Sequence, residues 1–344
     1  MTRRETRRWL AGVALGLVSA LARSATGLTE LPGVEGDGPV TVFYPSSGEA
    51  KPLKRGPFTL LLAWQGAPDR GNGRLIVASH GSGGSPWVHA DLARALVEAG
   101  FIVAMPLHHK DNYKDTSDIG PPSWRRRPAE VSRAIDAVAR EARFAQLLKL
   151  DNVGMYGMSA GGHTALAIAG GRWSTAKLSQ HCQAHIAADF QSCAGLSTQL
   201  RGDAFDSVKI WSVLTVVRWR FSDTAWQTYH DPRIAAVVAA VPYAGDFDMA
   251  SFATTRVPLG LVTAGQDRWL VPRFHSGAVL QACAPCELVA DVPGGGHGAL
   301  ISPIPPKLSG LEGELLRDPP GFERSVLPEV DRKIAAFFRK HLLP

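Results

Sequence analysis

Short apolar runs alternate with amphipathic stretches along most of this chain. Unbroken apolar runs bounded by turn residues predict buried strands, and apolar residues at helical spacing predict packed helices. We expect strands at 40–44, 58–64, 75–79, 101–105, 153–156, 231–241, 258–263 and 289–292, and helices at 90–99, 129–148, 162–169 and 327–341. This alternation predicts an α/β fold with a mostly parallel, doubly wound sheet.

The alternation breaks between residues 172 and 230, where aromatic residues gather. An insertion at this point follows the third expected helix, at 162–169, and would lie above the carboxyl ends of the strands. We interpret it as a lid, and we expect Trp211, Trp219 and Trp226 to line a substrate pocket beneath it. These side chains could equally form a small core of the insertion itself, and the sequence leaves both readings open.

The segment Gly157-Met158-Ser159-Ala160-Gly161 lies where the 153–156 strand should turn into the following helix. A serine flanked by glycines at a strand-to-helix turn is the nucleophile elbow of α/β-hydrolases. Glycines are needed because side chains would collide in so tight a turn. The pattern alone is only moderately specific, and its context decides its meaning.

The expected 75–79 strand runs into His80-Gly81-Ser82-Gly83-Gly84, a loop that can curl towards the elbow. In an α/β-hydrolase this loop supplies one N–H of the oxyanion hole, and the residue after the nucleophile supplies the other. We therefore assign the two donors to the backbone of Ser82 and Ala160. His80 is expected to orient the loop rather than to act on substrate.

Two further strand ends carry candidate partners for Ser159. Asp267 follows the expected 258–263 strand, and His297 lies in the glycine-rich loop after the 289–292 strand. The order Ser, Asp, His along the chain is the order that this fold requires. We predict a Ser159–His297–Asp267 triad.

The first residues resemble an export signal rather than part of the fold. Basic residues precede an apolar stretch at 10–21, too short to span a membrane comfortably, and Ala20-Leu21-Ala22 is a cleavage pattern. We expect a signal peptide at 1–22, loosely similar to a twin-arginine signal, and a mature domain at 23–344; an uncleaved anchor is the alternative. Periplasmic or secreted localisation follows in either case.

Composition supports one large globular domain without a nucleic-acid role. Apolar residues make up 45% of the 344 residues and charged residues 20%. Removing 1–22 takes away four arginines and one glutamate, which lowers the formal charge from +6 to +3. The short basic run at 125–127 lacks interleaved aromatic residues, so we expect a solvated or substrate-facing loop there.

Four cysteines in an exported protein predict disulfides. The favoured pairs are the two that are local in sequence, Cys182 with Cys193 and Cys283 with Cys286. No metal site is expected, because the cysteines lack suitable histidine spacing. His108, His109 and Asp111 are ligand types, but they read as a solvated loop, and His163 reads as a packed or hydrogen-bonded helix residue.

Residues 40–301 resemble the predicted dienelactone-hydrolase group of the α/β-hydrolase superfamily, which is related to bacterial homologues of platelet-activating-factor acetylhydrolase. The matching segments are 78–84, 127–128, 131–134, 156–166, 231–234 and 295–297. The resemblance implies a carboxylic-ester hydrolase without a cofactor. True dienelactone hydrolases use a cysteine where this chain has Ser159, which argues against lactone specificity. Some relatives carry the triad acid after the preceding strand, and the resemblance therefore makes Asp246 and Asp248 alternatives to Asp267.

The sequence therefore predicts an exported serine esterase that acts on small or short-acyl esters through an acyl-enzyme. Its expected partner is a small-molecule ester, with no nucleic acid and no stable membrane insertion once the signal is removed. A polyester-degrading esterase and an amidase or peptidase on the same triad are alternatives. A non-catalytic binding protein is a third class.

Overall fold

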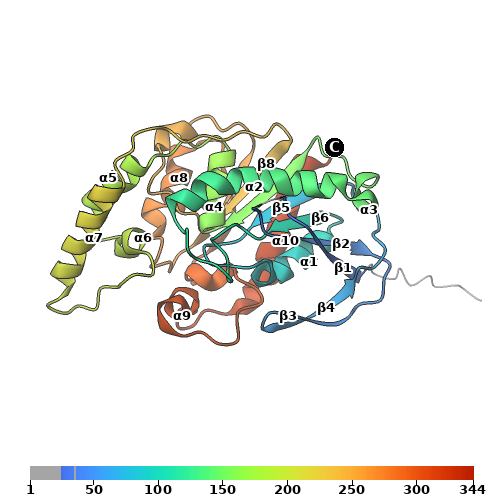
Figure 1. The fold of residues 1–344 in the computed structure, drawn as a ribbon, viewed down its shortest axis with the longest axis horizontal. Helices are drawn as coiled ribbons and strands as arrows, with labels where there is room; N and C mark the ends of the chain where they lie inside the picture. The colour runs from blue at the N-terminus through green and yellow to red at the C-terminus, as the bar shows by residue number, and fades with distance from the viewer. Residues whose placement is uncertain (1–24, 35) are drawn as a thin grey trace, which may run out of the picture.

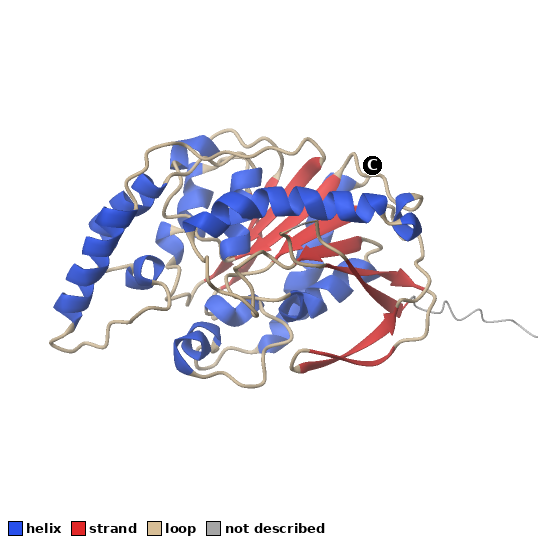
Figure 2. Cartoon of the chain, viewed as in Figure 1, coloured by secondary structure: helices blue, strands red, loops and turns tan. Residues whose placement is uncertain are grey.

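A computed structural model describes residues 25–34 and 36–344, so the expected signal peptide lies outside the described residues. The strands form one sheet of ten, in the order β10-β9-β8-β7-β5-β6-β2-β1-β4-β3 (Figures 1 and 2). They are β1 Ala25–Leu31, β2 Val40–Ser46, β3 Lys51–Arg55, β4 Phe58–Trp64, β5 Leu75–Ser79, β6 Ile102–Pro106, β7 Val153–Met158, β8 Ile234–Ala240, β9 Leu259–Ala264 and β10 Glu287–Val292. Neighbours from β6 to β10 are parallel, and β2 joins β6 antiparallel.

Helices cover both faces of the sheet. They are α1 Ala90–Glu98, α2 Pro121–Arg140, α3 Ala142–Ala145, α4 Ala160–Ile168, α5 Thr175–His185, α6 Phe190–Ala194, α7 Asp206–Arg220, α8 Ser276–Ala282, α9 Gly310–Leu316 and α10 Leu327–Leu342, with short 3₁₀ turns at Pro86–His89, Met249–Phe252, Pro272–Phe274, His297–Leu300 and Arg324–Val326. α2 and α4 lie on one face, and α1 and α10 lie on the other (Figure 1).

Strand β5 shows how the sequence builds both cores. Leu75 and Val77 pack with α2, and the alternate residues Ile76 and Ala78 pack with α1 and α10. All five residues of β5 are buried. Apolar residues on both sides of a strand are what a parallel sheet covered by two helical layers requires. The predicted mostly parallel α/β architecture is therefore present.

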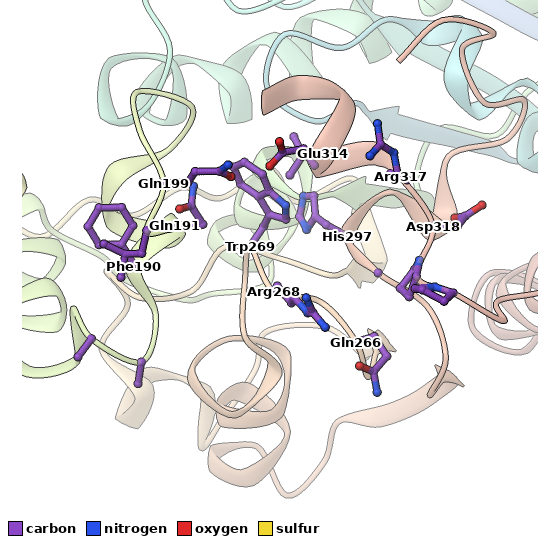
Figure 3. Close-up of a pocket in the computed structure, with 17 residues that line it drawn as sticks. Phe190, Gln191, Gln199, Gln266, Arg268, Trp269, His297, Glu314, Arg317 and Asp318 are labelled. Atoms are coloured by element: carbon purple, nitrogen blue, oxygen red, sulfur yellow. The ribbon is translucent and has the colours of Figure 1, made fainter. Parts of the chain in front are cut away.

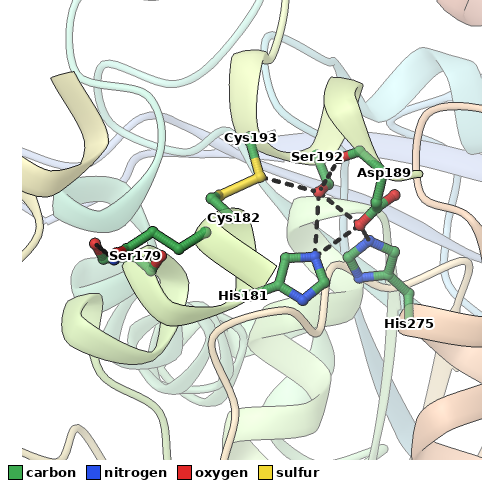
Figure 4. The surroundings of a disulfide bond; sticks show 8 residues. Ser179, His181, Cys182, Asp189, Ser192, Cys193 and His275 are labelled. Carbon is green, nitrogen blue, oxygen red and sulfur yellow. Dashed lines mark hydrogen bonds and ion pairs between the residues drawn. A yellow bond between two sulfur atoms is a disulfide. The ribbon is translucent and has the colours of Figure 1, made fainter. Parts of the chain in front are cut away.

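The segment expected to form a lid contains α5, α6 and α7, which stand beyond one end of the sheet (Figure 1). Cys182 in α5 is joined to Cys193 in α6, with 5.8 Å between their Cα atoms (Figure 4). Cys283 is joined to Cys286, with a Cα separation of 5.4 Å. These are the two pairs that the sequence favoured, and disulfides are compatible with an exported protein.

One predicted helix has other bounds in the structure, and several elements were not predicted. The helix expected at 129–148 is α2, which begins at Pro121, ends at Arg140 and carries Pro128 within it. Strands β1 and β3 and helix α9 were not foreseen.

Among the described residues, no helix has both the length and the apolar character to cross a membrane.

Candidate active site

Ser159 lies at the sharp turn between β7 and α4, in the strained backbone conformation φ 57°, ψ −116°. A Cβ atom at Gly157 would lie 1.9 Å from the carbonyl oxygen of Gly161, and one at Gly161 would lie 2.0 Å from the carbonyl oxygen of Ser79. Both glycines are therefore required by contact with backbone that cannot move aside. The turn leaves Ser159 partly exposed, between buried Met158 and buried Ala160.

His297 and Asp267 complete a row of hydrogen bonds with Ser159. His297 Nε2 lies 2.9 Å from Ser159 Oγ, and His297 Nδ1 lies 2.7 Å from Asp267 Oδ2. The carboxylate can only accept, so Nδ1 carries the proton and Nε2 is free to accept one from the serine. The histidine is 5% exposed and the aspartate 4%, which limits competition from water.

The other carboxylate oxygen of Asp267 is fixed by the backbone. Oδ1 accepts the N–H groups of Trp269 and Leu270, each at 2.9 Å. The two alternative acids do not contact His297: Asp246 bonds His163 Nε2 at 3.0 Å, and Asp248 pairs with Arg172. Of the three carboxylates considered from the sequence, the geometry thus favours Asp267.

Both segments that carry the assigned oxyanion donors adjoin the serine. Gly81 is so close that a Cβ placed on it would lie 3.4 Å from Ser159 Cβ. The N–H of Ala160 belongs to the first turn of α4, where no intrahelical acceptor exists. Within residues 25–34 and 36–344, neither this N–H nor that of Ser82 donates to another protein group. Both are available to a ligand.

A cavity of about 520 Å³ opens beside His297. Trp269 lies next to His297 in Figure 3, with Gln191 and Gln199 approaching from the insertion and Glu314 from α9. The insertion therefore forms one wall of this cavity, which His297 lines and Ser159 does not, through residues 187–200, which come before α7.

Trp211, Trp219 and Trp226 do not line this cavity, which corrects the prediction from the sequence. Their exposed fractions are 68%, 83% and 44%. The physical reason is the orientation of α7, which buries only Val217 fully and turns Trp211 and Trp219 to solvent. The guanidinium of Arg172 lies over the Trp226 ring, 5.1 Å from its centre.

The prediction that two polar segments are solvated is also wrong for three of their residues. Arg127, His108 and Asp111 are each 0% exposed. The sequence had predicted a solvated or substrate-facing loop for Arg127 and a solvated loop for His108 and Asp111. They lie together beneath the loop that carries Ser82. Sequence reasoning missed this group because a run of charges ordinarily marks the surface, and nothing local shows that Arg127 has a buried partner.

The described residues offer one histidine and aspartate cluster with the spacing of a metal site, formed by His181, Asp189 and His275 (Figure 4). Asp189 Oδ2 lies 2.7 Å from His181 Nε2 and 3.0 Å from His275 Nε2. His275 Nδ1 accepts the N–H of Ala244, so its Nε2 carries the proton and donates to Asp189. A protonated nitrogen cannot bind a metal ion, so the residues do not fit one.

This cluster instead joins the insertion to the loop after β9. Burial alone would raise the pKa of the Asp189 carboxyl, but hydrogen bonds from His181 and His275 hold the pKa well below its usual range. The ionised carboxylate thus links α5, the start of α6 and the loop after β9. The adjacent Cys182–Cys193 disulfide closes the same segment (Figure 4).

Comparison with known proteins assigns no family: no protein-family model matches this chain, and no curated protein matches it.

Proposed function

We propose that this chain is a serine hydrolase that cleaves carboxylic esters through an acyl-enzyme. The observation that carries the proposal is the hydrogen-bonded row of Ser159, His297 and Asp267, with Ser159 Oγ 2.9 Å from His297 Nε2. Its three members come from three separate strand ends. A purely structural role does not explain why a serine in a strained backbone conformation completes such a row.

In the first step Ser159 Oγ attacks the ester carbonyl carbon while His297 Nε2 takes the hydroxyl proton. The carbonyl π electrons move to the oxygen, which the N–H groups of Ser82 and Ala160 stabilise. Each such donor typically contributes about 3 kcal/mol to lowering the barrier. The resulting imidazolium is stabilised by Asp267, whose carboxylate is held on Nδ1 at 2.7 Å.

The tetrahedral intermediate then collapses. The carbonyl re-forms, the bond to the alcohol oxygen breaks, and His297 gives its proton to the leaving alcohol. Water enters, loses a proton to His297 and attacks the acyl carbon. The bond from that carbon to Ser159 Oγ then breaks, His297 returns the proton to Oγ, and the carboxylic acid leaves. No cofactor is needed for either half of this cycle.

The cavity beside His297 favours small or short-acyl esters. Its volume of about 520 Å³ lies in the lower half of the range for small-molecule sites. Trp269 and Phe190 supply apolar surface, and glutamines of the insertion supply amide groups. The proposed setting is outside the cytoplasm, in keeping with the two disulfides.

The test is turnover of p-nitrophenyl esters from acetate to palmitate by purified protein, with Ser159→Ala as the matched variant. We expect turnover that falls beyond short acyl chains and disappears in Ser159→Ala, while the melting temperature stays unchanged. Turnover retained by Ser159→Ala would refute the proposal. An inactive wild type whose Ser159 also fails to react with a fluorophosphonate would favour a binding protein instead.

A further inference from the structure

A buried ion pair lies beneath the loop of residues 80–84. Arg127 from α2 and Asp111 from the segment after β6 are joined by an Nη2–Oδ2 contact of 2.8 Å, and both side chains are 0% exposed. Removing two charges from water is costly unless every donor and acceptor finds a partner. The hydrogen-bond partners of this pair therefore show what the two charges hold in place.

The two side chains together hold four successive residues of the loop. Arg127 Nη1 donates to the carbonyl of His80 at 2.5 Å, and Nη2 donates weakly to that of Gly81 at 3.4 Å. Asp111 Oδ1 accepts from the Ser82 hydroxyl at 2.7 Å and from the Gly83 N–H at 3.0 Å. The pair thus contacts the loop immediately before and after the Ser82 N–H.

His80 fixes the same loop from its own side chain. Its Nδ1 donates to the carbonyl of Gly81 at 2.7 Å, and its Nε2 accepts the N–H of His108. Burial, with His108 and Arg127 nearby, lowers the pKa of His80 well below its ordinary value. The ring is therefore neutral and keeps a single proton on Nδ1.

A second serine and histidine row lies behind this loop, but it is closed to substrate. Ser79 Oγ lies 2.7 Å from His108 Nε2, and His108 Nδ1 contacts Glu130. Ser79 and His108 are 0% exposed and Glu130 is 3% exposed. With no route for an ester to reach Ser79, this row supports the loop rather than forming a second reaction centre.

These contacts determine the orientation of the peptide between Gly81 and Ser82. In a trans peptide the carbonyl and the following N–H point in opposite directions. The Gly81 carbonyl is held by His80 and by the Gly84 N–H, 3.1 Å away. The Ser82 N–H is consequently turned to the opposite edge of the peptide, and Gly81 adjoins Ser159.

We propose that Arg127 and Asp111 are positioning residues that hold the Ser82 N–H in place for the oxyanion, an inference that rests on the proposed ester-hydrolase function. Neither side chain touches the substrate. They act through the loop, and the Ser82 hydroxyl is the contact by which Asp111 fixes the residue that bears the donor. Their effect should therefore appear in the transition state and not in substrate binding.

The test uses Ser82→Ala, because Ser82 is exposed and the substitution keeps the backbone N–H. Its matched control is Ser132→Ala, which removes a similar hydroxyl-to-carboxylate bond, 2.6 Å long, to Asp231. Asp231 forms an ion pair with Arg233, as Asp111 does with Arg127, but this second pair does not hold the 80–84 loop. We expect kcat to fall about tenfold in Ser82→Ala with KM unchanged, and Ser132→Ala to keep wild-type kcat.

A second readout separates loss of the oxyanion donor from a general loss of order in the active site. Each variant is assayed on an oxygen ester and on the corresponding thionoester, whose sulfur is larger and a weaker acceptor. Damage confined to the oxyanion hole should slow the oxygen ester several-fold more than the thionoester. In an Asp111→Asn background, Ser82→Ala should cost clearly less than alone, because the bond that it removes is already weakened.

Ser82→Ala within twofold of wild type, or equal losses on both esters, would overturn the inference while leaving the esterase function intact. A wild type that neither turns over esters nor reacts with a fluorophosphonate at Ser159 would overturn the proposed function, and this inference with it. Counting active sites with the fluorophosphonate in every variant ensures that a loss of kcat is not a loss of folded protein.

Discussion

Replacing Asp267 with asparagine should separate its effect on the protonation of His297 from its hydrogen bonds to the backbone. Oδ1 of Asp267 accepts two backbone N–H groups, from Trp269 and Leu270, and Oδ2 accepts from His297 Nδ1. The side-chain oxygen of an asparagine should accept the two backbone N–H groups, because an NH₂ group in that position would place donor against donor. Its NH₂ group is then left facing His297.

The magnitude follows from the proton that His297 must move. Facing an NH₂ donor, Nδ1 has to accept, so the ring proton shifts to Nε2, which lies 2.9 Å from Ser159 Oγ. A protonated Nε2 cannot take the serine proton. A wrong tautomer of this kind lowers kcat by about 10⁴, which is about 5.4 kcal/mol of activation free energy.

The assay is kcat on a short p-nitrophenyl ester, with the melting temperature measured beside it. We expect Asp267→Asn to lose about 10⁴ in kcat and little stability. The matched control is Asp246→Asn, a buried aspartate bonded to His163 and out of contact with His297; it should keep kcat within a few-fold and lose about 1 kcal/mol of stability. The reasoning fails if Asp267→Asn keeps a tenth of the activity, or if Asp246→Asn shows the larger loss.

Three further predictions concern stability. Gly157→Ala should destabilise the fold by about 3 kcal/mol or more and abolish turnover, because its Cβ would lie 1.9 Å from the Gly161 carbonyl oxygen. Replacing Cys182 and Cys193 with serine should lower the free energy of unfolding by about 3 kcal/mol, measured in urea, since the bond spans a sequence separation of 11. Burial raises the pKa of the Asp331 carboxyl from 3.8 to about 7, so the native state keeps a proton that the unfolded chain loses. Stability should therefore fall as pH rises from about 4 to about 7, and Asp331→Asn should remove this fall, on the order of 2 kcal/mol for a partly buried group.

Each of these predictions has an internal comparison. Gly294→Ala lies in an open loop, where the nearest atom to a new Cβ is 3.8 Å away, and should be tolerated. The Cys283–Cys286 bond spans a separation of 3, so its removal should cost about 2 kcal/mol, less than the longer loop. A pH profile of stability that is the same in wild type and Asp331→Asn would contradict the assigned pKa.

The sequence was most informative where local geometry leaves little choice. Buried parallel strands need unbroken apolar runs, so the sequence predicts β5, β7 and β9 to within two residues of their observed bounds. Gly157 and Gly161 are dictated by contacts within and beside the turn itself. The residues brought together at Ser159 come from strand ends, and a parallel sheet gathers strand ends at one edge.

The sequence was least informative where tertiary packing decides. α7 is apolar on much of its circumference, so its composition does not show which side faces the protein. In the structure Val217 faces the protein, whereas Trp219 is 83% exposed. Arg127 stands in a run of arginines, which is typical of a solvated segment, and its partner Asp111 lies 16 residues away in the sequence. Burial of that pair depends on how α2 packs beneath the 80–84 loop, which no local pattern reveals.

The central claim is that Ser159 is a nucleophile activated by His297. Its most direct test is intact-mass and peptide mapping after reaction with a fluorophosphonate, on wild type, His297→Ala and Ser159→Ala. We predict a single adduct on Ser159 in wild type, labelling slowed at least a thousandfold in His297→Ala, and none in Ser159→Ala. Labelling of Ser159 at the wild-type rate without His297, or an adduct on another serine, would contradict the account.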